Sequence, residues 1–218
     1  MEYARGRGID LYGDGDARPI ILMWHGAQTD ARHAMRPLAE SVAAHGFTVL
    51  VPDWNSHADD GGRGDLLGSV DFARQRAGSD GVVLVGWSLG GVAAAGLTIH
   101  AARFDVRVAH TVCLAGAFVA REPITAAPLP TELPRQPSPF TLVHGVDDDV
   151  VPIEASRSFA ATLRDNAWPV EVAELAADHA TIAGATYDPA LDRYSAADDP
   201  KALAVANDVA ARIAAAVQ

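Results

Sequence analysis

The pattern Gly-x-Ser-x-Gly occupies residues 86–90, with Ser88 at its centre. A serine hydroxyl is a weak nucleophile until an imidazole takes its proton, and the imidazole needs a carboxylate to hold its tautomer. Candidates for both partners follow later in the chain, namely the aspartates at 147–149 and His179. These residue types, in the order Ser, Asp, His, predict attack of the serine on an acyl carbonyl if folding brings them together.

The sequence around Ser88 predicts a sharp turn from a strand into a helix. Residues 82–85 are apolar and mostly β-branched, as in a buried strand, and residues 92–97 are rich in alanine, as in a helix. Glycine at 86 and 90 avoids the collision that a Cβ would cause there, and the helix would direct free N–H groups at negative charge near Ser88. The alternative is a glycine-rich connection in an ordinary α/β protein. The strand before and the helix after favour the nucleophile.

Strand-like and helix-like segments alternate along the whole chain, which predicts βαβ units and a parallel sheet. Strands are expected at 19–24, 47–51, 82–85, 106–114, 140–144 and 170–175, and helices at 31–45 (capped by Asp30), 66–76, after Ser88, 153–166 and 200–217. Residues 1–18 are predicted to form a short edge strand or hairpin, and the proline-rich segment 121–139 a connection too short for a lid domain. Because the carboxyl ends of parallel strands share one edge of a sheet, the three candidate residues are expected to meet there.

Length and charge limit the number of domains and the classes of molecule that the protein is expected to bind. The 218 residues predict a single domain over 1–218 that can bury a full core. The net charge is -11 and no basic block is present, which argues against nucleic acid and anionic membrane as partners. The amino terminus lacks the apolar core of a secretory signal, and no apolar stretch approaches the length of a membrane span. A cytoplasmic location is therefore expected.

Three motifs in this order resemble those of the α/β-hydrolase superfamily, and within it the small single-domain carboxylesterases and dienelactone-hydrolase-like proteins. They are His25-Gly26 after the first buried strand, the elbow at 86–91, and His144-Gly145-x-x-Asp148-x-x-Val151-Pro152. The resemblance covers nearly the whole chain. It implies an α/β-hydrolase fold with a mostly parallel sheet, helices on both faces and no lid domain. It also places the acid on Asp148 rather than on its two aspartate neighbours.

The same resemblance implies an oxyanion hole made by the backbone N–H groups of Leu89 and Ala27, with Gln28 as the alternative donor to Ala27. Dienelactone hydrolases carry a cysteine nucleophile, whereas Ser88 stands at that position here. This difference favours cleavage of ordinary esters or thioesters over lactone chemistry. His179 is expected to be the base, because it follows an edge-type strand after the acid turn.

Other polar and aromatic residues leave alternatives open. His57 and the aspartates at 59 and 60 could join a metal site, but their spacing matches no regular ligand set, so neither a metal nor another cofactor is expected. Trp54 and Trp87 either pack in the core or shape an apolar pocket for the substrate.

The sequence therefore predicts a serine hydrolase that cleaves a small carboxylic ester or thioester through an acyl-enzyme intermediate. Ser88, Asp148 and His179 would form the triad. The rivals are an acyltransferase or lyase that uses the same triad, and a catalytically idle hydrolase fold that serves as a binding protein.

Overall fold

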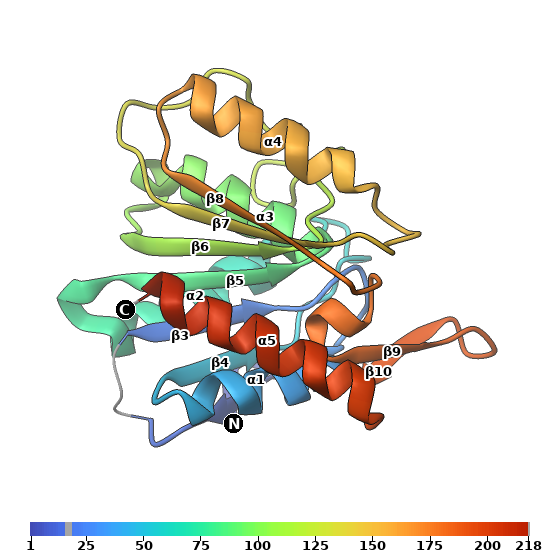
Figure 1. Ribbon diagram of the computed structural model, residues 1–218. Coiled ribbons are helices and arrows are strands. Elements are labelled where there is room, and N and C mark those ends of the chain that lie inside the picture. The colour runs from blue at the N-terminus through green and yellow to red at the C-terminus, as the bar shows by residue number, and fades with distance from the viewer. Residues whose placement is uncertain (16–18, 218) are drawn as a thin grey trace.

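A computed structural model describes residues 1–15 and 19–217 of the chain and shows one central sheet between layers of helices (Figure 1). The eight strands lie in the order β1-β2-β4-β3-β5-β6-β7-β8. Their bounds are Glu2–Ala4 (β1), Arg7–Tyr12 (β2), Ile20–Trp24 (β3), Thr48–Pro52 (β4), Val82–Trp87 (β5), Val108–Leu114 (β6), Phe140–Gly145 (β7) and Val170–Leu175 (β8). All pairings from β4 to β8 are parallel, and β1 and β2 join the edge antiparallel. The mostly parallel sheet and the edge hairpin confirm the predictions; residues 16–18 lie outside the described part.

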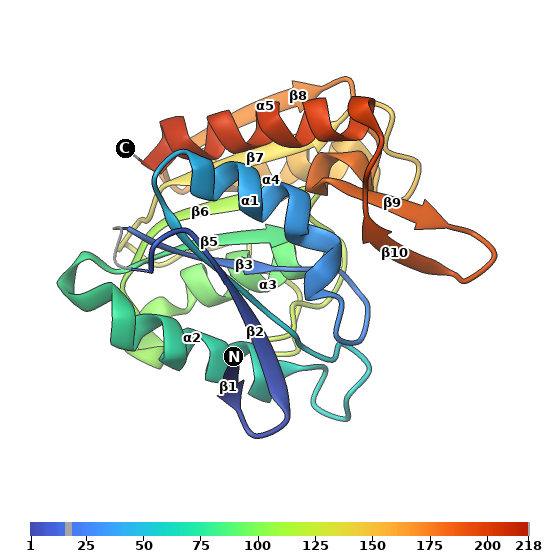
Figure 2. The same ribbon diagram turned by 90° about the horizontal axis from the view of Figure 1, so that it is seen from below.

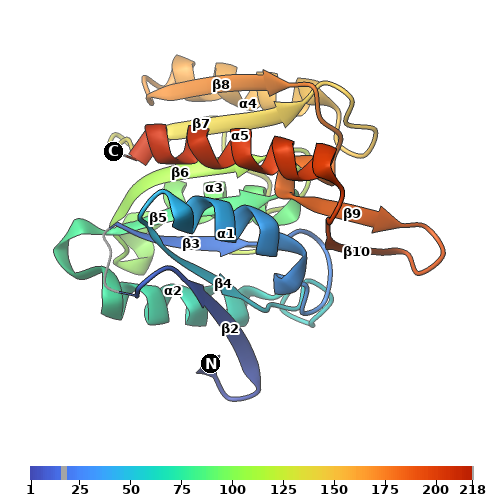
Figure 3. The same cartoon turned by 60° about the horizontal axis from the view of Figure 1, so that its bottom comes forward.

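Helices cover both faces of the sheet, as predicted (Figures 2 and 3). α1 and α5 lie on one face, and α2, α3 and α4 on the other. The α-helices are Arg36–Ala44 (α1), Arg63–Ala77 (α2), Leu89–Ile99 (α3), Ile153–Asp165 (α4) and Pro200–Val217 (α5); the short 3-10 helices are Arg32–Met35 (η1), Gly78–Asp80 (η2), Ala101–Phe104 (η3) and Thr181–Ala183 (η4).

The strand β3 shows why a continuous apolar run is needed at the centre of such a sheet. All of its residues are buried. Successive side chains of a strand point to opposite faces, so Ile21 and Met23 pack in the core with α1 and α5, while Ile20 and Leu22 pack in the core with α2 and α3. Both faces are thus closed to water.

One helix start differs from the prediction. Asp30 does not cap a helix: it has a positive φ of 52°, and its carboxylate pairs with Arg7 instead. The segment begins as η1, and α1 starts only at Arg36, with a proline in its first turn. The free backbone N–H of Ala31 donates to the His25 ring, so a tertiary contact replaces the expected local cap.

The sequence did not predict the hairpin of β9 (Ala185–Asp188) and β10 (Arg193–Ala196). This two-stranded antiparallel unit projects beyond the arrowheads of β7 and β8 in Figure 3. Its Tyr194 backbone N–H donates to the Gln28 side chain at 2.6 Å, which joins the hairpin to the loop after β3. None of the described helices is long and apolar enough to cross a membrane.

Candidate active site

Ser88 occupies a strained turn between β5 and α3. Its φ of 56° and ψ of -117° are rare for a residue with a side chain and cost of order 1–3 kcal/mol. A Cβ at Gly86 would overlap the backbone oxygen of Gly90, and a Cβ at Gly90 would overlap that of His25. The two glycines are therefore required by close packing of the turn, as the sequence predicted.

The acid turn after β7 holds a buried carboxylate against an imidazole. His179 Nδ1 donates to Asp148 Oδ2 at 2.8 Å, while the other oxygen, Oδ1, accepts from the backbone N–H groups of Val150 and Val151. His144 Nε2 lies 3.3 Å from Oδ2. Burial alone would raise the pKa of Asp148, but the hydrogen bonds from His144, His179 and the Val151 amide hold it below its ordinary value. Asp148 is thus the carboxylate of the cluster that contacts His179, and it stays ionised.

The indole of Trp87 connects the loop that carries His179 to the turn that carries Ser88. Its Nε1 donates to the backbone oxygen of His179 at 2.8 Å, and the two rings lie 5.5 Å apart. The His179 ring also lies 6.1 Å from the Tyr194 ring of β10. His179 is only 3 % exposed, and within the described chain its Nε2 has no hydrogen-bond partner.

The structure shows no hydrogen bond between Ser88 and His179 among the described residues. Among the residues that the structure describes, neither the Ser88 hydroxyl nor any other group bonds to His179 Nε2. Trp87, the residue before Ser88, nevertheless brings the two segments together. Catalytic hydrogen bonds are often long in enzymes without substrate, so the Ser88–His179 contact stays a prediction.

Two backbone N–H groups beside Ser88 are suited to hold an oxyanion. Those of Ala27 and Leu89 have no partner within residues 1–15 and 19–217, whereas that of Gln28 donates to Gly26 O at 2.8 Å. A Cβ at Gly26 would lie 3.2 Å from the Ser88 Cβ, so the loop that carries Ala27 runs directly past the nucleophile. This geometry favours Ala27 over Gln28 as the second donor.

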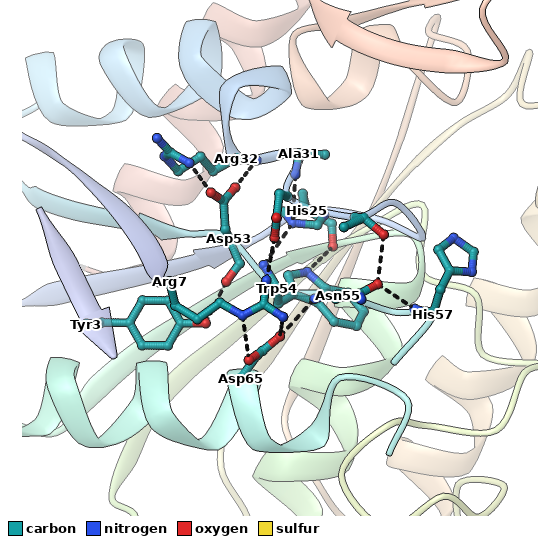
Figure 4. Close-up of polar contacts among 12 residues, drawn as sticks. Tyr3, Arg7, His25, Ala31, Arg32, Asp53, Trp54, Asn55, His57 and Asp65 are labelled. Carbon is teal, nitrogen blue, oxygen red and sulfur yellow. Dashed lines mark hydrogen bonds and ion pairs between the residues drawn. The ribbon is translucent and has the colours of Figure 1, made fainter. Parts of the chain in front are cut away.

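His25 holds that loop in place through hydrogen bonds of its ring (Figure 4). Its ring is fully buried; Nδ1 donates to Gly26 O at 2.9 Å, and Nε2 accepts from Ala31 N at 3.2 Å. The ring stacks on Trp54, whose Nε1 donates back to His25 O. Burial lowers the pKa of His25 to about 4, so the ring is neutral and can accept at Nε2.

Ion pairs surround this buried layer and order the loop after β4. Arg32 pairs with Asp53, and Arg7 with Asp65, which also accepts from Asn55 N at 3.0 Å (Figure 4). These side chains hold one another rather than a ligand. Among the described residues, no group of three or more His, Cys, Asp or Glu side chains is placed to hold a metal ion.

The structure corrects the role considered for the two tryptophans. Trp54 is fully buried beneath His25, and Trp87 is 2 % exposed between His179 and Tyr194. Neither indole offers a face to a substrate, so the packing alternative describes both. Their hydrogen bonds to backbone oxygens make them supports of the loops that carry the candidate catalytic groups.

The comparisons with known proteins agree with this geometry. Residues 21–217 match the model of the Alpha/beta hydrolase family. The chain belongs to the alpha/beta hydrolase family. This membership confirms the predicted fold and the prediction that the protein is a hydrolase-family enzyme.

Solved structures with the same fold include an esterase from Thermogutta terrifontis and Est1E from Butyrivibrio proteoclasticus. A thermophilic esterase from Thermogutta terrifontis, Est2 with propionate bound, has 18 % identity and a TM-score of 0.68, over 98 % of this chain and 93 % of that one. Est1E from Butyrivibrio proteoclasticus, with ferulic acid bound, has 14 % identity and a TM-score of 0.68, over 97 % and 95 %. Thermogutta terrifontis esterase 2 phosphorylated by paraoxon has 18 % identity and a TM-score of 0.66, over 95 % and 89 %. No curated protein sequence matches this chain.

Proposed function

We propose that this protein is a serine hydrolase that cleaves small carboxylic esters or thioesters through an acyl-enzyme intermediate. The observation that carries the proposal is the His179 ring, which is held at Nδ1 by buried Asp148 at 2.8 Å and keeps Nε2 free, on a loop that Trp87 ties to the Ser88 elbow. An imidazole in this state can accept a proton at Nε2, because Asp148 stabilises the cation that forms.

In the first step, His179 Nε2 takes the proton of Ser88 Oγ as the oxygen attacks the acyl carbonyl carbon. The N–H groups of Ala27 and Leu89 receive the negative charge on the carbonyl oxygen, where each donor contributes about 3 kcal/mol to transition-state stabilisation. His179 then protonates the leaving alcohol or thiol, the carbon–oxygen or carbon–sulfur bond breaks, and Ser88 carries the acyl group.

In the second step, His179 takes a proton from water, which attacks the acyl-serine; collapse releases the carboxylic acid and returns the proton to Ser88 Oγ. The reaction needs no group beyond the side chains and amides named. Supporting similarity comes from the structural neighbours, which are esterases recorded with propionate or with a phosphoryl group from paraoxon. The segment 116–139 forms a connection without helix or strand, which favours small substrates over lipid aggregates.

The test is hydrolysis of p-nitrophenyl acetate and butyrate, together with labelling by paraoxon read as intact mass. We expect Ser88→Ala to abolish turnover and labelling. The matched control is Ser158→Ala, which removes an exposed hydroxyl on α4 and should retain both. Undiminished turnover by the Ser88→Ala protein would overturn the proposal.

A further inference from the structure

A cavity of about 590 Å³ adjoins the candidate base, with His179 in its wall. The loops after β7 and β8 and the β9–β10 hairpin enclose it. Four aspartates and two tyrosines supply most of its polar and aromatic surface: Asp147, Asp149, Asp178, Asp192, Tyr187 and Tyr194. No lysine or arginine is among its lining residues. The candidate base His179 therefore borders a strongly acidic cavity, while Ser88 and the candidate oxyanion donors lie outside its lining.

The negative charge of this compartment is not neutralised by the described parts of the protein. The carboxylates of Asp147 and Asp149 are exposed and form neither a hydrogen bond nor an ion pair within those parts. Asp178 accepts from the backbone of its own turn, and Asp192 accepts from the hydroxyl of Tyr187 at 2.6 Å. Neutral donors fix these two side chains but leave their charge in place.

The field of these carboxylates reaches the wall beside His179. Burial first, then Tyr187 once its phenol ionises, and then the carboxylates of Asp148, Asp149 and Asp178 raise the pKa of Tyr194 above its ordinary value. The rings of Tyr187 and Tyr194 lie 4.9 Å apart, and Tyr187 is 44 % exposed. Aromatic faces attract cations through their quadrupoles, so rings and carboxylates favour the same sign of ligand charge.

The position of His179 indicates which part of a substrate enters the cavity. Its side chain is almost fully buried, and its unpartnered Nε2 is the atom that protonates the leaving group in the proposed reaction. The leaving oxygen must come within hydrogen-bond reach of Nε2, so the alcohol that continues from it extends along the wall that His179 forms. We infer that this cavity selects esters whose alcohol portion carries a permanent positive charge, such as a quaternary ammonium group. This inference rests on the proposed function.

The test compares acetylcholine with its neutral isostere, in which a tert-butyl group replaces trimethylammonium. The two esters share shape and reacting bond, so the ratio of their kcat/KM values reports charge alone. We expect a preference for the cation of about tenfold at an ionic strength of about 0.01 M, falling severalfold at about 0.15 M as screening shortens from about 30 Å to about 8 Å.

The double variant Asp147→Asn/Asp149→Asn should bring the ratio close to one. The control is Asp80→Asn/Asp165→Asn, which removes the same charge from exposed residues in η2 and at the end of α4, at the opposite edge of the sheet, and should keep the wild-type ratio. A wild-type ratio of one or less, or a ratio that the first double variant does not change, would overturn the inference.

A second measurement separates this inference from the proposed function. If the neutral ester is cleaved through Ser88 but the cation is not preferred, the hydrolase proposal stands and the substrate class is wrong. If neither ester is cleaved and p-nitrophenyl acetate is not hydrolysed either, the hydrolase proposal fails. Calorimetric titration of the wild-type protein with choline and with its neutral tert-butyl alcohol isostere then tests whether the cavity binds a cation, independently of catalysis. Tighter binding of choline that Asp147→Asn/Asp149→Asn removes supports a cation site, and equal binding of the two alcohols contradicts it.

Discussion

His25 and His179 each follow a strand of the central sheet and are each almost fully buried, yet among the described residues only His179 leaves a ring nitrogen without a partner. The ring of His25 uses both nitrogens on backbone groups of its own loop, Gly26 O and Ala31 N. The ring of His179 uses only Nδ1, on Asp148. Burial is therefore common to both residues, and the free nitrogen distinguishes the chemically available ring from the structural one.

A third histidine, His144, supports this distinction. Its Nε2 donates to Val151 O at 2.9 Å and its Nδ1 accepts from Ser156 Oγ at 2.7 Å, so both nitrogens are occupied. It lies next to Asp148 without competing for a substrate proton.

The largest effect is expected from replacing His179, the ring with a free nitrogen. We expect His179→Gln to lower kcat/KM for p-nitrophenyl acetate by about 10⁵-fold or more, because in the proposed mechanism His179 takes the proton of Ser88. The melting temperature should fall as well, since the variant loses the hydrogen bond from His179 Nδ1 to the buried carboxylate of Asp148, and circular dichroism checks that the fold is kept. His45→Gln, which alters an exposed ring at the end of α1, is the control and should keep full activity. Retained activity in the His179→Gln protein would assign the base elsewhere.

Removing the carboxylate partner tests what orients the available ring. Asp148→Asn should lower kcat/KM by about 10⁴-fold, because an amide can favour the wrong tautomer of His179 and cannot stabilise its cation. The measurement is steady-state kinetics on the same ester. Asp149→Asn, one residue away, should lose far less activity on this neutral ester. Equal losses in the two variants would contradict the assignment of the acid.

The pH dependence of the free energy of unfolding should show that His25 stays neutral in the folded protein. The pKa of His25 is about 4 in the folded protein against 6.5 for an ordinary histidine. Between these values the unfolded chain holds a proton that the folded chain does not, so the free energy of unfolding falls as pH drops through this window. The decrease from His25 alone is about 3 kcal/mol.

Urea denaturation across that window checks this expectation, with His25→Gln as the comparison. The variant should be less stable at neutral pH by about 2 kcal/mol, because the N–H groups of Ala31 and Trp54 lose their acceptor. It should also lack the additional loss of stability at acidic pH. Parallel pH profiles for the two proteins would show that the ring does not stay neutral on folding.

The smallest expected effect is on stability, from the loss of the hydrogen bond that Ser156 donates to His144. Ser156→Ala removes the donor to Nδ1 and leaves that buried nitrogen unsatisfied, at a cost of about 1 kcal/mol in the free energy of unfolding. Ser158→Ala on the same helix is exposed and should change stability by less than the error of a urea titration. Equal stability of the two variants would mean that the Ser156 contact contributes nothing.

The strands and the elbow could be predicted because their signals are local. The apolar run at 82–85 lies within β5, the run at 140–144 lies within β7, and the glycines around Ser88 follow from the packing of one turn. The acid turn could be predicted because its residues resemble the α/β-hydrolase motif, and that resemblance placed the acid on Asp148. Each of these features depends on residues only a few positions apart.

Features that depend on distant contacts were missed or misassigned. The β9–β10 hairpin has no clear alternating apolar pattern; Tyr194 anchors it through Gln28 and the Trp87 ring, which lie far away in sequence. Trp54 could be placed neither in a pocket nor in the core until His25 was found stacked on it. A polar segment without a local signal can be ordered by partners that no window of the sequence contains.

The sequence by itself determined the parallel sheet, the strained turn at Ser88 and the order of the candidate groups, because hydrophobic periodicity and the sterics of glycine act over short stretches of chain. Tertiary structure alone decided which histidine keeps a free nitrogen, which tryptophans serve as supports, and that an acidic cavity adjoins His179. Those outcomes depend on which groups meet after folding. Hydrogen bonding and burial, unlike local conformational preference, are properties of the assembled neighbours.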